Sequence, residues 1–145
     1  MKQFKLFTIL ALSFMLFSCG GNAQSEQKTI NTSINRIEVI GFHSTHRCMT
    51  CNAIEANTKY TLSTYFADEL KSGKITSNYI NVDKEENLVI AEKYEASGTS
   101  LFLNVVVNGV ETTINLTEFA FSKGRKKEEF ARGLKYKIEK QLEKI

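Results

Sequence analysis

Proline and tryptophan are both absent from the 145 residues, and the chain contains only three cysteines and two histidines. Without proline the chain has no cis-prolyl bond, the form in which nearly all cis peptide bonds occur. The formal net charge of +3 is too small to indicate a nucleic-acid partner, and none is expected. The chain is long enough for one hydrophobic core and too short for two, so we expect a single domain.

The first 18 residues are typical of a secretory signal peptide. Lys2 and Lys5 give a basic start, and an apolar run from Leu6 to Phe17 follows. This run is too short for a permanent transmembrane helix, which needs roughly 20 residues. We therefore leave residues 1–18 out of the fold prediction.

Leu16-Phe17-Ser18-Cys19 closes this segment and resembles the bacterial lipobox. The resemblance implies cleavage before Cys19 and lipidation of that cysteine, which would anchor the protein to a membrane. Residues 19–33 are small and polar, which predicts a flexible tether to a domain at 34–145. No acidic run follows Cys19, which favours the outer membrane, facing the periplasm. The alternative is an ordinary signal peptide with an incidental cysteine.

Hydrophobic periodicity predicts four strands and three helices in the remaining chain. The expected order is a strand at 36–42, a helix at 51–71, a strand at 75–82, a helix at 85–95, strands at 101–107 and 110–116, and a final helix built on Phe130, Leu134, Ile138 and Leu142. Asn108-Gly109 predicts a hairpin turn between the last two strands, because both positions tolerate a positive φ.

Cys48 and Cys51 lie between the first predicted strand and the first predicted helix. A disulfide between them would close too short a loop to be a strong structural staple. A thiolate at Cys48 would be favoured by the helix N-terminus and by the adjacent cation Arg47. His43 and His46 would add to this effect when they are protonated, so all three neighbours are expected to lower the pKa of Cys48.

The same segment also allows a metal site. His43, His46, Cys48 and Cys51 offer two imidazoles and two thiolates, a ligand set suited to Zn²⁺ or Cu(I). All four lie within nine residues, which strains coordination of one ion by a single short loop. The other interpretation of the two histidines is that they are solvent-exposed loop residues. Redox chemistry is the favoured hypothesis, without a bound metal or other cofactor.

The strand and helix order, with CxxC after the first strand, resembles the thioredoxin arrangement. Three further stretches carry the resemblance: Asn81-Val82-Asp83, Lys93-Tyr94 and 101–109. It implies a thioredoxin-like three-layer α/β fold with a central mixed sheet in the order β-α-β-α-β-β-α. It also implies that Cys48 is the exposed nucleophile and that Cys51 resolves the mixed disulfide.

The chain departs from the thioredoxin pattern at several functional positions. Thr99 takes the place of the cis-proline, and Thr99 and Ser100 are therefore the expected substrate-binding pair. Arg47 takes the place of the usual tryptophan. Phe42 and Tyr79 take the places of the buried acid and the lysine that handle protons in thioredoxins, so efficient general disulfide reduction is not implied.

More narrowly, the lipobox together with the motif from His43 to Cys51 resembles a family of exported lipoproteins described as nitrophenyl-compound nitroreductase subunits, the ArsF family. The predicted function is thiol–disulfide exchange or electron relay through Cys48 and Cys51. The expected partners are exported thiol or disulfide proteins or a membrane redox complex. The alternatives are a metal-binding protein and a non-catalytic accessory subunit of a redox complex.

Overall fold

A computed structural model of the chain describes residues 35–145. The predicted signal peptide, the lipidation site Cys19 and the predicted tether lie outside the described residues. Within residues 35–145, no helix combines the length and the apolar character needed to cross a membrane.

Four strands form one mixed sheet in the order β2-β1-β3-β4. The parallel pair is β1 with β2, and the other two neighbouring pairs are antiparallel. The elements follow one another as β1 (Arg36–His43), α2 (Met49–Tyr65), α3 (Ala67–Ser72), β2 (Ile75–Asn81), the 3₁₀ turn η1 (Glu85–Asn87), α4 (Leu88–Lys93), β3 (Ser100–Val107), β4 (Val110–Asn115), α5 (Thr117–Lys123) and α6 (Lys127–Leu142).

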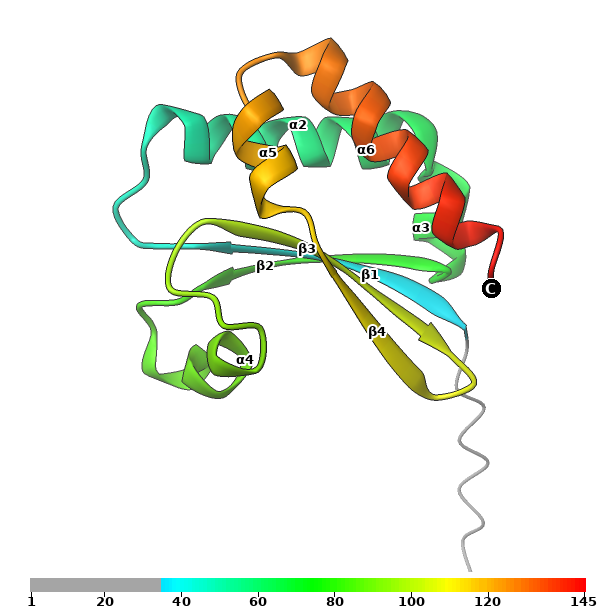
Figure 1. Cartoon of the computed structure of the whole chain (residues 1–145), viewed down its shortest axis with the longest axis horizontal. Helices are drawn as coiled ribbons and strands as arrows, with labels where there is room; N and C mark the ends of the chain where they lie inside the picture. The colour runs from blue at the N-terminus through cyan, green and yellow to red at the C-terminus, as the bar shows by residue number, and fades with distance from the viewer. Residues whose placement is uncertain (1–34) are drawn as a thin grey trace, which may run out of the picture. The chain divides into compact units, whose positions relative to one another are not determined.

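Helices cover both faces of the sheet, with α2, α3, α5 and α6 on one side and α4 on the other (Figure 1). The alternation of side chains along β1 explains the three layers, because successive residues of a strand point to opposite faces. Ile37 and Val39 belong to the larger core, which includes Leu134 of α6. Ile40 and Phe42 belong to a smaller core under α4. The predicted three-layer thioredoxin-like α/β fold is confirmed.

The long helix predicted for 51–71 is divided at Phe66. Phe66 has φ −136° and ψ 32°, which is not helical, and its side chain is buried in the larger core. The helix was predicted from residues that recur every four positions: Ile54, Thr58, Leu62, Phe66 and Leu70. In a helix of 3.6 residues per turn, each step of four residues moves the side chain about 40° around the axis. An unbroken helix would therefore have carried Leu70 away from the core, and the break at Phe66 turns it back.

The last predicted strand is one residue too long, and a helix was missed after it. Leu116 is buried and ends the strand region, and α5 begins at Thr117. Seven residues span only about two helical turns, which is too few for a clear helical period in the sequence. The helix predicted for 85–95 is shorter than expected and begins with the 3₁₀ turn η1.

Gly41 allows β1 and β2 to meet beneath α2. A Cβ atom at Gly41 would come within 2.4 Å of Cε1 in the Tyr79 ring, which is closer than any real contact. We expect Gly41→Ala to lower the free energy of unfolding by roughly 1–3 kcal/mol, because the buried ring must move. Chemical denaturation measures this loss. The matched control is Gly98→Ala, where the nearest atom, Ser44 Oγ, is 3.7 Å away. Equal stability of the two variants would contradict the account.

Candidate active site

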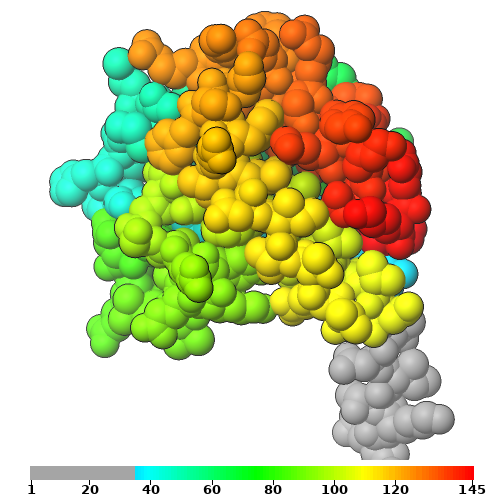
Figure 2. All heavy atoms as spheres, in the orientation of Figure 1, coloured from blue at the N-terminus to red at the C-terminus, as the bar shows by residue number. Residues whose placement is uncertain are grey.

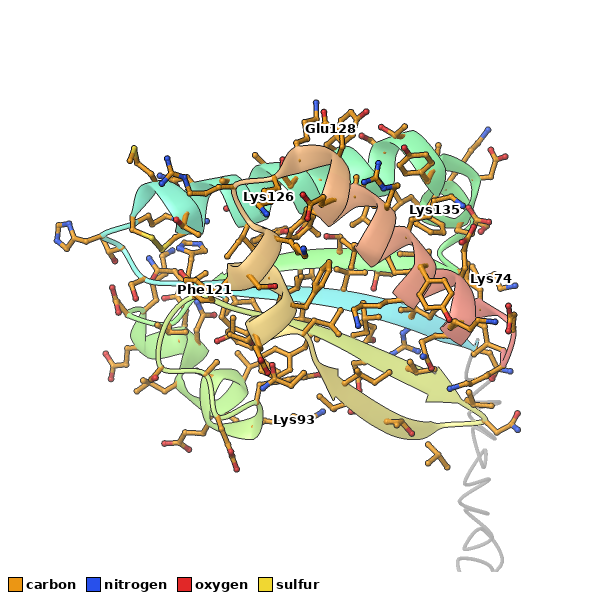
Figure 3. The ribbon with its side chains drawn as sticks, turned by 45° about the horizontal axis from the view of Figure 1, so that its top comes forward. Lys74, Lys93, Phe121, Lys126, Glu128 and Lys135 are labelled. Carbon is orange, nitrogen blue, oxygen red and sulfur yellow. A yellow bond between two sulfur atoms is a disulfide. The ribbon has the colours of Figure 1, made fainter. Side chains whose placement is uncertain are left out.

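The two cysteines form a disulfide at the start of α2 (Figure 3). Their Cα atoms are 5.0 Å apart, within the usual range for a disulfide. Cys48 is the N-cap residue of α2, and its sulfur accepts a hydrogen bond of 3.0 Å from the Cys51 amide. The same sulfur therefore caps the helix and takes part in the disulfide.

The two sulfurs differ in their access to solvent. Cys48 is exposed, Met49 beside it is 75% exposed, and Cys51 is half-buried. In Figure 2 the segment that carries the cysteines, in cyan, projects at the left edge of the view. Cys48 is therefore the sulfur that an approaching protein reaches first. A thiolate there would lie at the positive end of the helix dipole, and the first turn of α2 contains no acidic residue to oppose it.

The loop between β1 and α2 is held by Asp83, which sequence reasoning did not identify as part of the site. The Thr45 amide donates a hydrogen bond of 2.6 Å to Asp83 Oδ2, and Asn81 Nδ2 donates one of 3.1 Å to Thr45 Oγ1. His43 and His46 lie close enough to act electrostatically on the same carboxylate. The backbone hydrogen bond from Thr45 is the main cause that lowers the pKa of Asp83, and the two histidines add to it.

Arg47 is adjacent to Cys48 in sequence, but its guanidinium forms an ion pair with Glu55 of α2. Glu55 also pairs with Lys59, one helical turn further along. Burial opposes ionisation of Glu55, but hydrogen bonds from Lys59 and Arg47 outweigh it and lower the pKa of the carboxyl. The only sequence signal for Glu55 was its spacing of four residues from Cys51, which places both on one helix face.

Thr99 and Ser100 lie at the same end of the sheet as the cysteines, where the antiparallel ladder pairs Ser100 with Phe42. A Cβ atom at Gly98 would be 3.7 Å from Ser44 Oγ, so the loop before β3 lies beside the loop before α2. In residues 35–145 no side-chain hydrogen bond joins Thr99 or Ser100 to either cysteine, and no cis peptide bond occurs.

The structure corrects the assignment of Phe42 to the place of a buried acid beneath the cysteines. Phe42 points to the opposite face, where its ring packs 5.5 Å from Tyr94 and 5.8 Å from Phe102. Gly41 and Tyr79 face α2 instead. Residue 42 lies on the face of β1 that points away from α2, because each step of one residue along a strand reverses the face.

Tyr79 lies half-buried beneath α2, with its hydroxyl group fully buried. Its hydroxyl has no hydrogen-bond partner among the described residues, and the nearby Thr58 hydroxyl donates to the Ile54 carbonyl instead. Burial raises the pKa of Tyr79 well above its ordinary value. The side chain is therefore neutral and carries no charge toward the cysteine helix.

The proposed ligands of the metal alternative do not form a site in this structure. Across residues 35–145, no group of three or more histidine, cysteine, aspartate or glutamate side chains is arranged to hold a metal ion. His46 is exposed, and the Nδ1 atom of His43 is 3.0 Å from the Ser44 carbonyl oxygen.

No family model and no curated protein sequence matches the chain. Among solved structures, a thioredoxin from Thermus thermophilus is similar with a TM-score of 0.46 and 21% sequence identity, over 70% of this chain and 72% of that one. A malarial protein is similar with a TM-score of 0.39 and 18% identity, over 61% of this chain and 96% of that one. The sheet order and the three layers are those expected for a thioredoxin-like fold, and the Cys48–Cys51 disulfide lies at the start of α2 within it.

The contact between Asp83 and Thr45 predicts an acid-sensitive loop. Because the pKa of Asp83 is lowered in the folded protein, the stability it contributes is present above the pKa of an unfolded aspartate and is lost as the pH falls through the folded value. We expect the Thr45 amide resonance in ¹H–¹⁵N spectra to titrate with a midpoint below the ordinary range of aspartate. Asp83→Asn should abolish this titration. A midpoint at or above the ordinary value would contradict the assignment.

Proposed function

We propose that the protein performs thiol–disulfide exchange on exported proteins through Cys48 and Cys51. The observation that supports this most directly is the unequal exposure of a disulfide at a helix N-terminus, with Cys48 open to solvent and Cys51 half-buried. A purely structural disulfide gains little from closing so short a loop. A disulfide that exposes one sulfur at a surface is suited to exchange with a partner.

In the reducing direction, the Cys48 thiolate attacks one sulfur of a substrate disulfide. A bond forms between Cys48 and that sulfur, the substrate bond breaks, and the other substrate sulfur leaves as a thiolate. Cys51 then loses its proton to solvent and attacks the Cys48 sulfur, forming the Cys48–Cys51 bond and releasing the second substrate thiolate. Two electrons pass from the pair to the substrate, and the oxidising direction is the exact reverse.

The residues around the cysteines have different roles in this reaction. The helix N-terminus stabilises the Cys48 thiolate, while Thr99 and Ser100, at the same end of the sheet, contact the chain that carries the substrate disulfide. Gly41 and neutral Tyr79 provide no carboxylate or ammonium group beneath α2. These two residues therefore take no proton from Cys51, which favours a dedicated partner over broad reductase activity.

The membrane anchor at Cys19 and a periplasm-facing position on the outer membrane belong to the same proposal, with exported thiol proteins or a membrane redox complex as partners. The lipobox supports the anchor. The resemblance to the lipoproteins described as nitrophenyl-compound nitroreductase subunits rests on the lipobox and the motif from His43 to Cys51. We assign no nitro-compound substrate from it.

The exchange reaction is tested by separating attack from resolution. Reduced Cys51→Ser protein treated with oxidised glutathione should accumulate a stable mixed disulfide at Cys48, which intact-protein mass spectrometry detects. Wild-type protein should proceed to the Cys48–Cys51 disulfide. Cys48→Ser should react with oxidised glutathione at about one tenth of the Cys51→Ser rate or more slowly still. Its remaining thiol, Cys51, is half-buried and lacks the helix N-terminal position.

Reduction of insulin disulfides by the wild type, coupled to dithiothreitol, tests a protein substrate. We expect Cys48→Ser to abolish the catalysed part of this rate. Retention of the rate in Cys48→Ser, or equal glutathione reactivity of the two single variants, would reject the proposal.

The anchor is tested on the full-length chain expressed in a bacterium with a lipoprotein pathway. Cys19→Ser should move the protein from the membrane fraction to the soluble periplasmic fraction, and the wild-type N-terminal peptide should carry acyl mass on Cys19. An unmodified Cys19 in the mature wild-type protein would contradict the prediction. Cys48→Ser is the control and should leave the membrane fraction unchanged.

A further inference from the structure

Arg47, Glu55 and Lys59 form an ion cluster along α2, next to the cysteine pair. Glu55 accepts contacts from both cations, Arg47 through Nη2 and Lys59 through Nζ. The Arg47 and Glu55 side chains are only 22% and 16% exposed, whereas Lys59 is 62% exposed. The contact between Arg47 and Glu55 is therefore the more sheltered of the two, and it is less screened by solvent than an ordinary surface ion pair.

Two members of the cluster lie near the cysteines in the sequence, one next to Cys48 and the other one helical turn after Cys51. Arg47 directly precedes Cys48, and Glu55 lies four residues after Cys51 on the same helix. Residues at this spacing are neighbours on a helix surface, with Cβ atoms about 5–6 Å apart. Glu55 is also the first acidic residue along α2. It is thus the nearest carboxylate to the cysteines on their own helix.

The floor of the cluster is apolar and neutral. Lys59 Nζ lies 5.1 Å from the centroid of the Tyr79 ring, and burial keeps the Tyr79 hydroxyl un-ionised. Arg47 Nε and Tyr79 Oη are both buried without a hydrogen-bond partner in residues 35–145. In the described residues no other carboxylate pairs with the Arg47 guanidinium. Removal of the Glu55 charge would therefore leave the positive charge of Arg47 without a partner, next to Cys48 in the sequence.

Other charged groups approach the start of α2 from the neighbouring elements. Asp83 is engaged by the Thr45 amide, with His43 and His46 nearby. On the opposite side, Gly124 packs against Thr50 and Ile54, which brings the exposed Arg125 toward the first turns of the helix. None of these groups takes part in the ion pairs of Glu55.

We propose that Glu55 is a positioning residue that sets the reactivity of the cysteine pair, because it holds and neutralises the guanidinium of Arg47. With Glu55 present, the cation that adjoins Cys48 in sequence is directed along α2. The Cys48 thiolate then receives less stabilisation than Arg47 alone would give it, and the disulfide is harder to reduce. This rests on the proposed function only in taking Cys48 as the reacting thiol.

The test combines Glu55→Gln, Arg47→Gln and the double variant. The pKa of Cys48 is measured from the pH dependence of its alkylation in the Cys51→Ser background. The equilibrium with glutathione is measured with both cysteines present. The control is Glu139→Gln, which removes a similar lysine–glutamate pair of α6, Lys135 with Glu139, from a helix that carries no cysteine.

Glu55→Gln should lower the pKa of Cys48 by roughly half a unit or more, because it removes a negative charge near the negatively charged thiolate. It should also shift the glutathione equilibrium about threefold toward the reduced pair, since the thiolate form is stabilised. Arg47→Gln should raise the pKa of Cys48, because a nearby cation is lost and Glu55 is left with Lys59 as its one ion-pair partner in the described residues. The double variant should return close to the wild-type value.

These opposite signs and their cancellation separate an electrostatic role from a structural one, since loosening of the helix would shift both single variants in one direction. Glu55→Gln values equal to those of Glu139→Gln would overturn the inference, as would shifts of the same sign in the two single variants. If Glu55→Gln does not fold by circular dichroism, Arg47→Gln together with the double variant decides. The readouts require no protein substrate, so insulin reduction that persists in Cys48→Ser would reject the proposed function and leave this inference intact.

Discussion

The hydrogen bond from the Cys51 amide to the Cys48 sulfur links the chemistry of this protein to the start of a helix. Helix N-termini leave amide groups without partners inside the helix, and a cap must satisfy some of them. Here the capping atom is itself half of a disulfide. The redox state of the pair and the first turn of α2 are therefore coupled, and every neighbour of that turn bears on the reactivity of Cys48.

Two sets of contacts place this turn. Asp83, at the end of the segment that follows β2, holds the loop before α2 through the Thr45 amide. From within the helix, Glu55 holds Arg47 at the end of the same loop. The loop is thus held from both ends by carboxylates, and its cationic residues interact with those carboxylates. Arg47 contacts Glu55, and His43 and His46 lie near Asp83.

Beneath the helix, a tyrosine ring packs against a glycine of the neighbouring strand. Tyr79 fills the space that Gly41 leaves open between β1 and β2. A buried neutral phenol cannot accept or supply a proton near neutral pH, because burial raises its pKa further. The described structure therefore places an exposed Cys48 and a half-buried Cys51 above a neutral phenol.

The sequence by itself determined the order of most strands and helices and the placement of Cys48 and Cys51 at a helix start, because local periodicity and turn chemistry are carried by consecutive residues. The three-layer α/β fold was implied by the resemblance of that order to thioredoxins. The sequence did not determine the break at Phe66, the face on which Phe42 lies, or the pairing of Arg47 with Glu55. Each of these depends on which side chains meet across the core or along a folded helix. Contacts between residues that are distant in sequence, or that become neighbours only after folding, leave no local period, so only the tertiary structure decided them.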